Sequence, residues 1–247
     1  MLVSVIMPYF KKKKYISESI NSVLNQTYQK YEIIIVYDDD NLDELSYLEK
    51  LKQNNCQIKI VKNDKNMGAG YSRNIGIKKS SGELIAFLDC DDVWNSNKLE
   101  EQIRFMKKNK ISFSYTAYYI IDESSKKIGL RSVKNELSYD DLIKSCDIGL
   151  STVMLSKNLI SRENNFANLK TKEDYVLWLK LAKSKVTMLG IKEVYSSWRK
   201  SDNSLSSNTI QKLKDGFVVY YKYMGFNIIK SLFCLLRLSL NFLIKNK

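Results

Sequence analysis

Histidine is absent from this chain of 247 residues, and proline (one residue) and cysteine (four residues) are scarce. Without histidine the chain has no Ser-His-Asp or Cys-His catalytic arrangement, no histidine-ligated zinc and no imidazole general base. Any proton transfer must therefore fall to a carboxylate, lysine, tyrosine or cysteine. No two cysteines form a C-x-x-C pair, which argues against a structural zinc site and indicates reduced thiols in the cytosol.

Acidic residues are also in short supply, and the sequence predicts no secretory signal. The 40 Lys and Arg outnumber the 27 Asp and Glu and give a net charge of +13. That surplus predicts an anionic partner such as nucleic acid, anionic lipid or a phosphorylated small molecule, unless it reflects only a lysine-rich surface. The lysines at 11–14 follow the first apolar segment, whereas a signal peptide carries its positive charge before that segment. We therefore expect a cytoplasmic protein.

Short apolar runs in the first 90 residues predict four β-strands, and helical periodicity fills the gaps between them. The runs lie at 3–7, 32–36, 57–61 and 84–88. Strands that alternate with helices predict parallel βαβ units, and hence an α/β fold with a mostly parallel central sheet flanked by helices. Further along, strands are expected at 112–122 and 149–156, and an amphipathic helix at 172–184.

Polar or aromatic side chains follow three of the expected strands, in the segments PYF (8–10), YDDD (37–40) and DCDD (89–92). Open parallel sheets bind ligands beyond the carboxyl ends of their strands. We therefore expect these three segments to line one crevice.

Three carboxylates, those of Asp89, Asp91 and Asp92, lie within four positions and repel one another unless a cation lies among them. Carboxylates at a strand end suit Mg²⁺ or Mn²⁺, and Mg²⁺ takes one or two protein carboxylates and completes its shell with water and substrate phosphates. The alternative is an exposed acidic loop that caps the following helix, which the isolated motif does not exclude.

The glycines Gly68 and Gly70 suggest a dinucleotide-binding loop, but the motif does not close. Arg73 stands at the position of its third glycine, and the segment precedes a strand instead of following one. Arg73 itself could reach a phosphate or a base edge from a helix N-terminus, or it could be an ordinary surface arginine.

Four stretches together resemble family 2 glycosyltransferases of the bacterial cell envelope, which have the nucleotide-diphospho-sugar transferase (GT-A) fold. The stretches are residues 3–40, 65–103, 171–184 and 198–206. Each stretch alone is a weak signal, but their order and spacing together are specific. The resemblance implies a GT-A domain at 1–208, with 209–247 as a separate C-terminal region.

The resemblance implies a nucleotide site at the first strand ends. Pro8 and Tyr9 would pack against the base, usually uracil, and Asp38 or Asp39 would accept a hydrogen bond from it. Arg73 would lie near the nucleotide.

It also implies the catalytic groups. Asp89 and Asp91 would form the DxD motif that holds the ribose and the metal on the diphosphate, with Asp92 as a further metal ligand. Asp174 would be the catalytic base and Arg199 a nucleotide-sugar ligand. An alternative for Asp174 is an acid favoured simply by the N-terminal end of its helix.

The chain departs from the family pattern at two places. Tyr37 is either inserted or replaces the first aspartate of the common VDDGSTD segment, so the carboxylate that meets the base is not fixed. The segment 198–206 lacks the histidine that is common there in the family.

The predicted activity is an inverting, metal-dependent transfer of a sugar from a nucleotide-diphospho-sugar, expected to be UDP-linked. The acceptor would be a hydroxyl of a glycan or of a lipid-linked acceptor in envelope polysaccharide or lipopolysaccharide synthesis. A divalent metal would stabilise the departing diphosphate, and a carboxylate would take the acceptor proton. Two alternatives stay open: an idle relative that only binds nucleotide sugars, and a phosphorylatable receiver-type signalling domain.

Residues 217–247 predict a basic amphipathic helix. Lys230 and Arg237 interrupt its apolar run, so no stretch reaches the roughly 20 residues that span a bilayer. One stripe along the helix is polar and comprises Lys230, Cys234, Arg237, Asn241 and Lys245. The opposite face is apolar and comprises Ile229, Leu232, Phe233, Leu236, Leu240 and Leu243. We expect peripheral binding to the anionic inner membrane surface and no nucleic-acid partner; packing on the domain or on a second subunit is the alternative.

Overall fold

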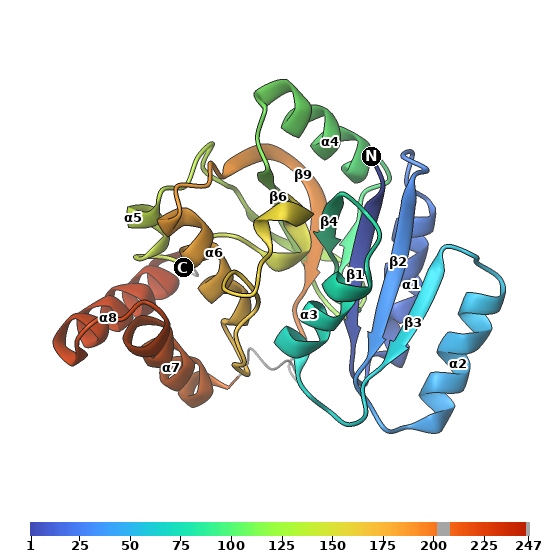
Figure 1. Cartoon of the computed structure of the whole chain (residues 1–247), viewed down its shortest axis with the longest axis horizontal. Coiled ribbons are helices and arrows are strands. Elements are labelled where there is room, and N and C mark those ends of the chain that lie inside the picture. The colour runs from blue at the N-terminus through green and yellow to red at the C-terminus, as the bar shows by residue number, and fades with distance from the viewer. Residues whose placement is uncertain (202–207, 246–247) are drawn as a thin grey trace.

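The computed structural model describes residues 1–201 and 208–245. Within them, nine strands form one mixed sheet in the order β3-β2-β1-β4-β8-β6-β9-β5, and β7 pairs with β6. Figure 1 shows helices on both sides of this sheet, with α7 and α8 at the opposite end of the molecule from α2 and β3.

The first half of the sheet is parallel, as the alternation of strands and helices predicts. Its strands are β1 (Val3–Tyr9), β2 (Tyr31–Tyr37), β3 (Ile58–Lys62) and β4 (Leu84–Phe87). Its helices are α1 (Lys13–Leu24), α2 (Leu42–Gln53) and α3 (Ala69–Lys79). Both faces of β1 and β2 are buried, because Val5 packs in the core with α1 and α2 while Ile6 packs in the core with α3. Burial on both faces explains why these strands are continuous apolar runs.

The second half is mixed. Its strands are β5 (Val93–Trp94), β6 (Phe113–Ile121), β7 (Lys127–Arg131), β8 (Met154–Ser156) and β9 (Leu189–Arg199). Helix α4 (Lys98–Asn109) precedes β6, and the short helix α5 (Tyr139–Leu142) follows β7. The strand expected at 149–156 begins only at Met154, because Leu150–Thr152 forms a 3-10 helix, and a second one follows at Lys157–Leu159.

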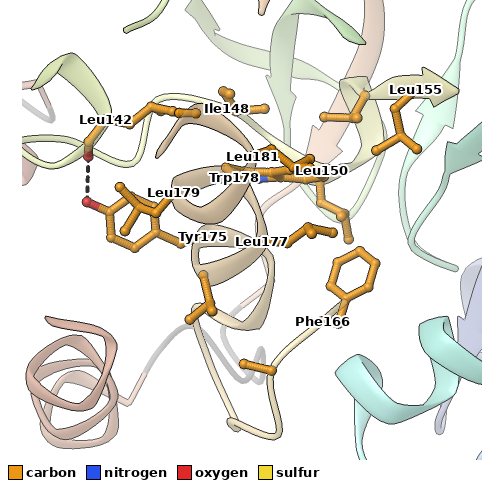
Figure 2. Packing of buried hydrophobic residues seen from close by; sticks show 14 of the residues in the cluster. Leu142, Ile148, Leu150, Leu155, Phe166, Tyr175, Leu177, Trp178, Leu179 and Leu181 are labelled. Atoms are coloured by element: carbon orange, nitrogen blue, oxygen red, sulfur yellow. Dashed lines mark hydrogen bonds between the residues drawn. The ribbon is translucent and has the colours of Figure 1, made fainter. Parts of the chain in front are cut away.

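Helix α6 (Glu173–Lys183), expected at 172–184, is fixed by a buried aromatic cluster. Trp178 is fully buried and meets the ring of Phe113 edge-on, with 5.1 Å between ring centroids. Figure 2 shows Trp178 among leucines from several elements, and Tyr175 directed at Leu142, whose carbonyl accepts its hydroxyl at 2.5 Å. The packing fixes where this helix begins, which matters because its first turn carries Asp174.

The C-terminal region shares this core. It comprises α7 (Thr209–Val218), a π-helical turn (Val219–Tyr223) and α8 (Ile228–Lys245). Tyr220 is fully buried, and its hydroxyl lies 3.0 Å from that of Tyr175 and donates to the carbonyl of Ile143. Asp215 accepts from the backbone and hydroxyl of Thr171, both at 2.9 Å. The domain boundary after residue 208 therefore stays a prediction from sequence. In the structure, the residues on its two sides pack against each other.

Helix α8 packs on the domain through the side that carries Ser231, Cys234 and Leu238. Part of the predicted polar stripe faces inward, because Cys234 is buried and the Asn241 amide donates to the carbonyl of Lys144 at 2.8 Å. The predicted apolar face is exposed instead: Ile229 is 81% exposed and Leu236 58%. Among the described residues, no helix is both long enough and apolar enough to cross a membrane.

Candidate active site

The three polar strand ends meet at one edge of the sheet. Strands β2, β1 and β4 are adjacent and parallel, so the residues after them, including Asp38 and Asp89, emerge side by side. The start of α6 reaches the same edge, because Arg73 of α3 bonds both Asp89 and Glu173. The strand ends expected to line one crevice therefore lie at the same edge of the sheet, next to the start of α6.

Asp38 organises the loop before α3. One of its carboxylate oxygens accepts from the side chain of Asn63 at 2.7 Å and from the backbone of Met67 at 2.8 Å, and the other accepts from the backbone of Gly68 at 2.8 Å. Gly68 has φ of +89°, a conformation that favours glycine. Asp38 thus holds the turn that delivers Arg73 to the site.

Asp39 has fewer partners within the protein. It is buried, and it accepts from the backbone of Asp40 at 2.8 Å and from the backbone of Lys11 at 3.1 Å. Since a carboxylate has about four lone-pair positions, Asp39 retains more acceptor capacity than Asp38.

Tyr9 is part of the core at the end of β1. It is fully buried, stacks on Tyr37 with 5.5 Å between ring centroids, and donates its hydroxyl to Glu44 at 2.6 Å. Burial and the Glu44 carboxylate raise the pKa of Tyr9, so its hydroxyl stays protonated. Pro8 is partly exposed beside it. The β1–β2 ladder is regular through Tyr37, so this tyrosine continues the strand and forms no bulge.

Arg73 links three elements. It is 3% exposed and donates to Asp89 at 2.8 Å and to Glu173 at 2.5 Å. Burial disfavours the charged guanidinium, but the two carboxylates outweigh it and raise the pKa of Arg73. Contact with a nucleotide stays a prediction; what the geometry shows is a bridge from α3 to the acidic loop and to α6.

Lys12 is the second cation of the acidic cluster, and the sequence analysis missed it. Its ammonium lies 2.5 Å from a carboxylate oxygen of Asp91. Burial lowers the pKa of Lys12, but Asp91 outweighs it, and the net pKa is raised. One signal was available: 11–14 is a run of lysines at a helix start, where the helix dipole disfavours cations.

Asp92 points into the protein. It is 1% exposed, and it accepts from the Ser151 hydroxyl at 2.5 Å and from the backbone of Arg199 at 2.9 Å. Burial raises the pKa of Asp92 well above its usual range. Because the carboxylate is buried and both of its oxygens accept bonds from within the protein, this geometry does not support its expected role as a metal ligand.

Arg199 is also turned inward. Its side chain is 0% exposed and donates to the carbonyl of Asp91 at 2.8 Å and to the carboxylate of Glu18 at 2.6 Å. It also donates to the carbonyl of Asp122 at 3.0 Å. The structure thus places Arg199 behind the acidic loop as a brace, and direct contact with a nucleotide sugar would require rearrangement. The following residues, 202–207, lie outside the described part of the chain.

Asp174 lies in the first turn of α6, partly exposed but surrounded by protein on most sides. Burial, followed by the like charge of Glu173, raises the pKa of Asp174 to about 7. One oxygen accepts from the backbone of Tyr175 at 2.7 Å. A carboxylate with this pKa can take a proton near neutral pH.

The acidic loop fits an open divalent-cation site. The side chains of Asp89 and Asp91 are 33% and 14% exposed, and each uses one oxygen in an ion pair. Within residues 1–201 and 208–245, no three acidic, cysteine or histidine side chains form a closed metal cage. Mg²⁺ suits such a site, because it takes one or two carboxylates and fills its shell with water and phosphate oxygens.

A family model and three known proteins are similar to this chain. Residues 4–178 match the model described as glycosyl transferase family 2. The UDP-Glc:α-D-GlcNAc-diphosphoundecaprenol β-1,3-glucosyltransferase WfgD of Escherichia coli is 40% identical over 215 residues, which cover 86% of this chain and 83% of that protein.

Two solved structures share the fold. S. aureus TarS in complex with UDP-GlcNAc superposes with a TM-score of 0.73 at 20% identity, over 95% of this chain and 70% of that chain. The mannosyltransferase PcManGT from Pyrobaculum calidifontis, in complex with GDP-Man and Mn²⁺, gives 0.71 at 13% identity, over 94% and 69%. At these identities the likeness shows the fold alone.

Proposed function

Because this chain belongs to glycosyl transferase family 2 and has the GT-A fold, we propose that it transfers a sugar from a UDP-linked donor to a lipid-linked acceptor, with inversion at the anomeric carbon. WfgD is named for a UDP-linked donor and a lipid-linked acceptor, and TarS has been solved in complex with UDP-GlcNAc. Such an acceptor belongs to the synthesis of envelope polysaccharide or lipopolysaccharide. Family membership sets the receiver-type alternative aside.

The observation that carries this proposal is the separation of two acidic groups on different elements. Asp89 and Asp91 follow β4, whereas Asp174 lies in the first turn of α6. Arg73 fixes the distance between the two groups, because it bonds both Asp89 and Glu173. Asp89 and Asp91 would hold a divalent cation, which supplies charge stabilisation for the departing diphosphate. Asp174 takes the proton of the attacking hydroxyl. A single base opposite the leaving group permits direct displacement, which inverts the anomeric centre.

We also propose that Asp39, and not Asp38, accepts the hydrogen bond from the base. Asp38 already accepts three bonds from residues 63–68, whereas Asp39 accepts two from local backbone. Asp39→Ala should therefore weaken UDP binding while thermal stability is retained, and Asp38→Ala should destabilise the fold. Equal UDP affinity in Asp39→Ala and the unchanged chain would count against this assignment.

The proposal is tested by a donor screen followed by a transfer assay. Thermal shifts against a panel of nucleotide sugars with Mn²⁺ should identify UDP-linked donors, and EDTA should abolish those shifts. Radiolabelled sugar should then appear on a GlcNAc-diphospho-lipid acceptor. Donor binding without any transfer or donor hydrolysis would instead support the idle alternative.

Peripheral binding to an anionic membrane is part of the proposed function. The exposed face of α8 carries large apolar side chains, and exposed cations flank it at Lys222, Lys230 and Arg237. An exposed apolar face next to cations suits the headgroup region of an anionic bilayer. This position would hold the enzyme beside a lipid-linked acceptor.

A further inference from the structure

Lys12 pairs with Asp91, one of the two carboxylates that would hold the divalent cation. It is the N-cap residue of α1, three positions after the end of β1, and its ammonium lies 2.5 Å from Asp91. The neighbouring lysines are directed elsewhere: the Lys13 ammonium lies 5.6 Å from the ring centroid of Tyr47, and Lys14 pairs with Glu123 at 2.7 Å. Of these three, only Lys12 contacts the acidic loop.

The ion pair is partly sequestered from water. The side chains of Lys12 and Asp91 are 28% and 14% exposed, so screening is weaker than for a surface pair. Without Lys12, Asp91 would lie close to Asp89 with no cation of its own. Lys12 therefore stabilises the acidic loop when neither metal nor donor is bound.

A divalent cation on Asp91 would weaken the Lys12 ion pair, because like charges a few ångströms apart repel each other in a partly buried site. The lysine stem is long and flexible, so its ammonium can swing while its backbone stays fixed at the strand end. The diphosphate of a donor would bring new negative charge to the same place.

We propose that Lys12 is a donor-binding residue that neutralises Asp91 in the empty site and moves to the donor diphosphate when a divalent cation takes Asp91. This inference rests on the proposed function, since it requires a diphosphate donor. The consequence is that metal binding and donor binding are coupled. When the metal binds alone, Lys12 loses the ion pair with Asp91 and gains no new partner. When metal and donor bind together, Lys12 pairs with the diphosphate. Metal and donor should therefore strengthen each other's binding.

The test measures Mn²⁺ binding by electron paramagnetic resonance, with and without UDP, in the full chain. Lys12→Gln should bind Mn²⁺ alone about five- to tenfold more tightly than the unchanged protein, because the competing ion pair is gone. In the presence of Mn²⁺ the same variant should bind UDP several-fold more weakly. Lys13→Gln is the matched control, since it makes the same charge change one residue away, and it should stay within about twofold.

Lys12→Arg keeps a competing cation and should keep the weak Mn²⁺ binding of the unchanged protein. Equal Mn²⁺ affinity in Lys12→Gln and Lys13→Gln, or weaker binding in Lys12→Gln, would overturn the inference. Failure of the proposed function looks different: the unchanged protein would then bind no UDP under any condition, while the Mn²⁺ arm alone would still report on Lys12 and Asp91.

Discussion

At the scale of single residues, Arg73 connects the acidic loop after β4 with the start of α6. Its guanidinium is buried between Asp89 and Glu173, and removal would leave two carboxylates without their cation. Loss of one partner of a buried pair typically destabilises a protein by about 3–5 kcal/mol. We expect Arg73→Gln to lower the free energy of unfolding by this amount, measured by urea denaturation, and to abolish transfer.

Arg104 is the matched control for that variant. It pairs with Glu101 on the exposed surface of α4, with 69% of its side chain exposed. Exposed pairs contribute only about 0–1 kcal/mol, so Arg104→Gln should leave stability and transfer nearly unchanged. Similar losses of stability and transfer in both variants would show that the Arg73 bridge contributes no more than an exposed ion pair.

Asp174 makes a prediction about pH at the same scale. Burial raises its pKa to about 7, and only the ionised form can accept the proton of the acceptor hydroxyl. The transfer rate at saturating donor should therefore rise as the pH increases through about 7. Below pH 7 the rate should fall about tenfold for each pH unit, because Asp174 becomes protonated. The measurement is a rate profile from pH 5.5 to 8.5 with UDP affinity recorded at each pH. A rate that is constant across this range would mean that Asp174 is not the base.

At the scale of elements, the C-terminal helices stabilise α6. Five buried residues of this region belong to the same core cluster as Tyr175: Val219, Tyr220, Met224, Cys234 and Leu238. A chain that ends at Asn208 loses all of them, so we expect it to lack a cooperative thermal transition by circular dichroism. The control is the full-length double variant Leu232→Ser with Leu236→Ser, which changes only exposed side chains and should melt like the unchanged protein.

This expectation differs from the one drawn from sequence, which allowed a separable domain at 1–208. Periodicity predicted that residues near the C-terminus are helical, and they are, but it could not tell which side of α8 packs inward. Ser231, Cys234, Leu238 and Asn241 meet the domain. The predicted apolar face stays exposed, and it comprises Ile229, Leu232, Phe233, Leu236, Leu240 and Leu243. Hydrophobic periodicity shows that a helix is amphipathic, but it does not show what each face of the helix contacts.

The parallel strands were predictable because burial on both faces leaves a continuous apolar run. The clustering of three carboxylates in the acidic loop could be seen in the sequence, but the side chains that pair with them could not. Lys12 lies 79 positions from Asp91, and Arg73 lies 100 positions from Glu173, so no local pattern relates them. The inward direction of Asp92 and Arg199 likewise depends on Ser151 and Glu18, which only the fold brings near.

At the scale of the whole molecule, the exposed face of α8 predicts binding to anionic vesicles. Its apolar side chains would enter the interface, and each nearby cation adds about 1 kcal/mol of attraction, weakened by salt. The full chain should sediment with phosphatidylglycerol-containing vesicles and less so at high salt. The triple variant Leu232→Ser, Phe233→Ser and Leu236→Ser should stay in the supernatant.

The control for the vesicle experiment lies on β7. Ile128 and Leu130 are 52% and 57% exposed, close to the exposure of the three altered residues. The double variant Ile128→Ser with Leu130→Ser should sediment like the unchanged protein. If the triple variant still sediments, or if both variants lose binding equally, α8 is not the membrane-binding element.

The central claim is that a metal-assisted donor site and a separate base perform inverting sugar transfer. The most direct measurement is the turnover of Asp174→Asn at saturating UDP-sugar and divalent cation, with donor affinity measured in parallel. The account predicts that turnover falls by at least about a hundredfold while donor affinity stays within about twofold, because only the acceptor proton loses its base. Turnover above about a tenth of that of the unchanged protein would contradict it.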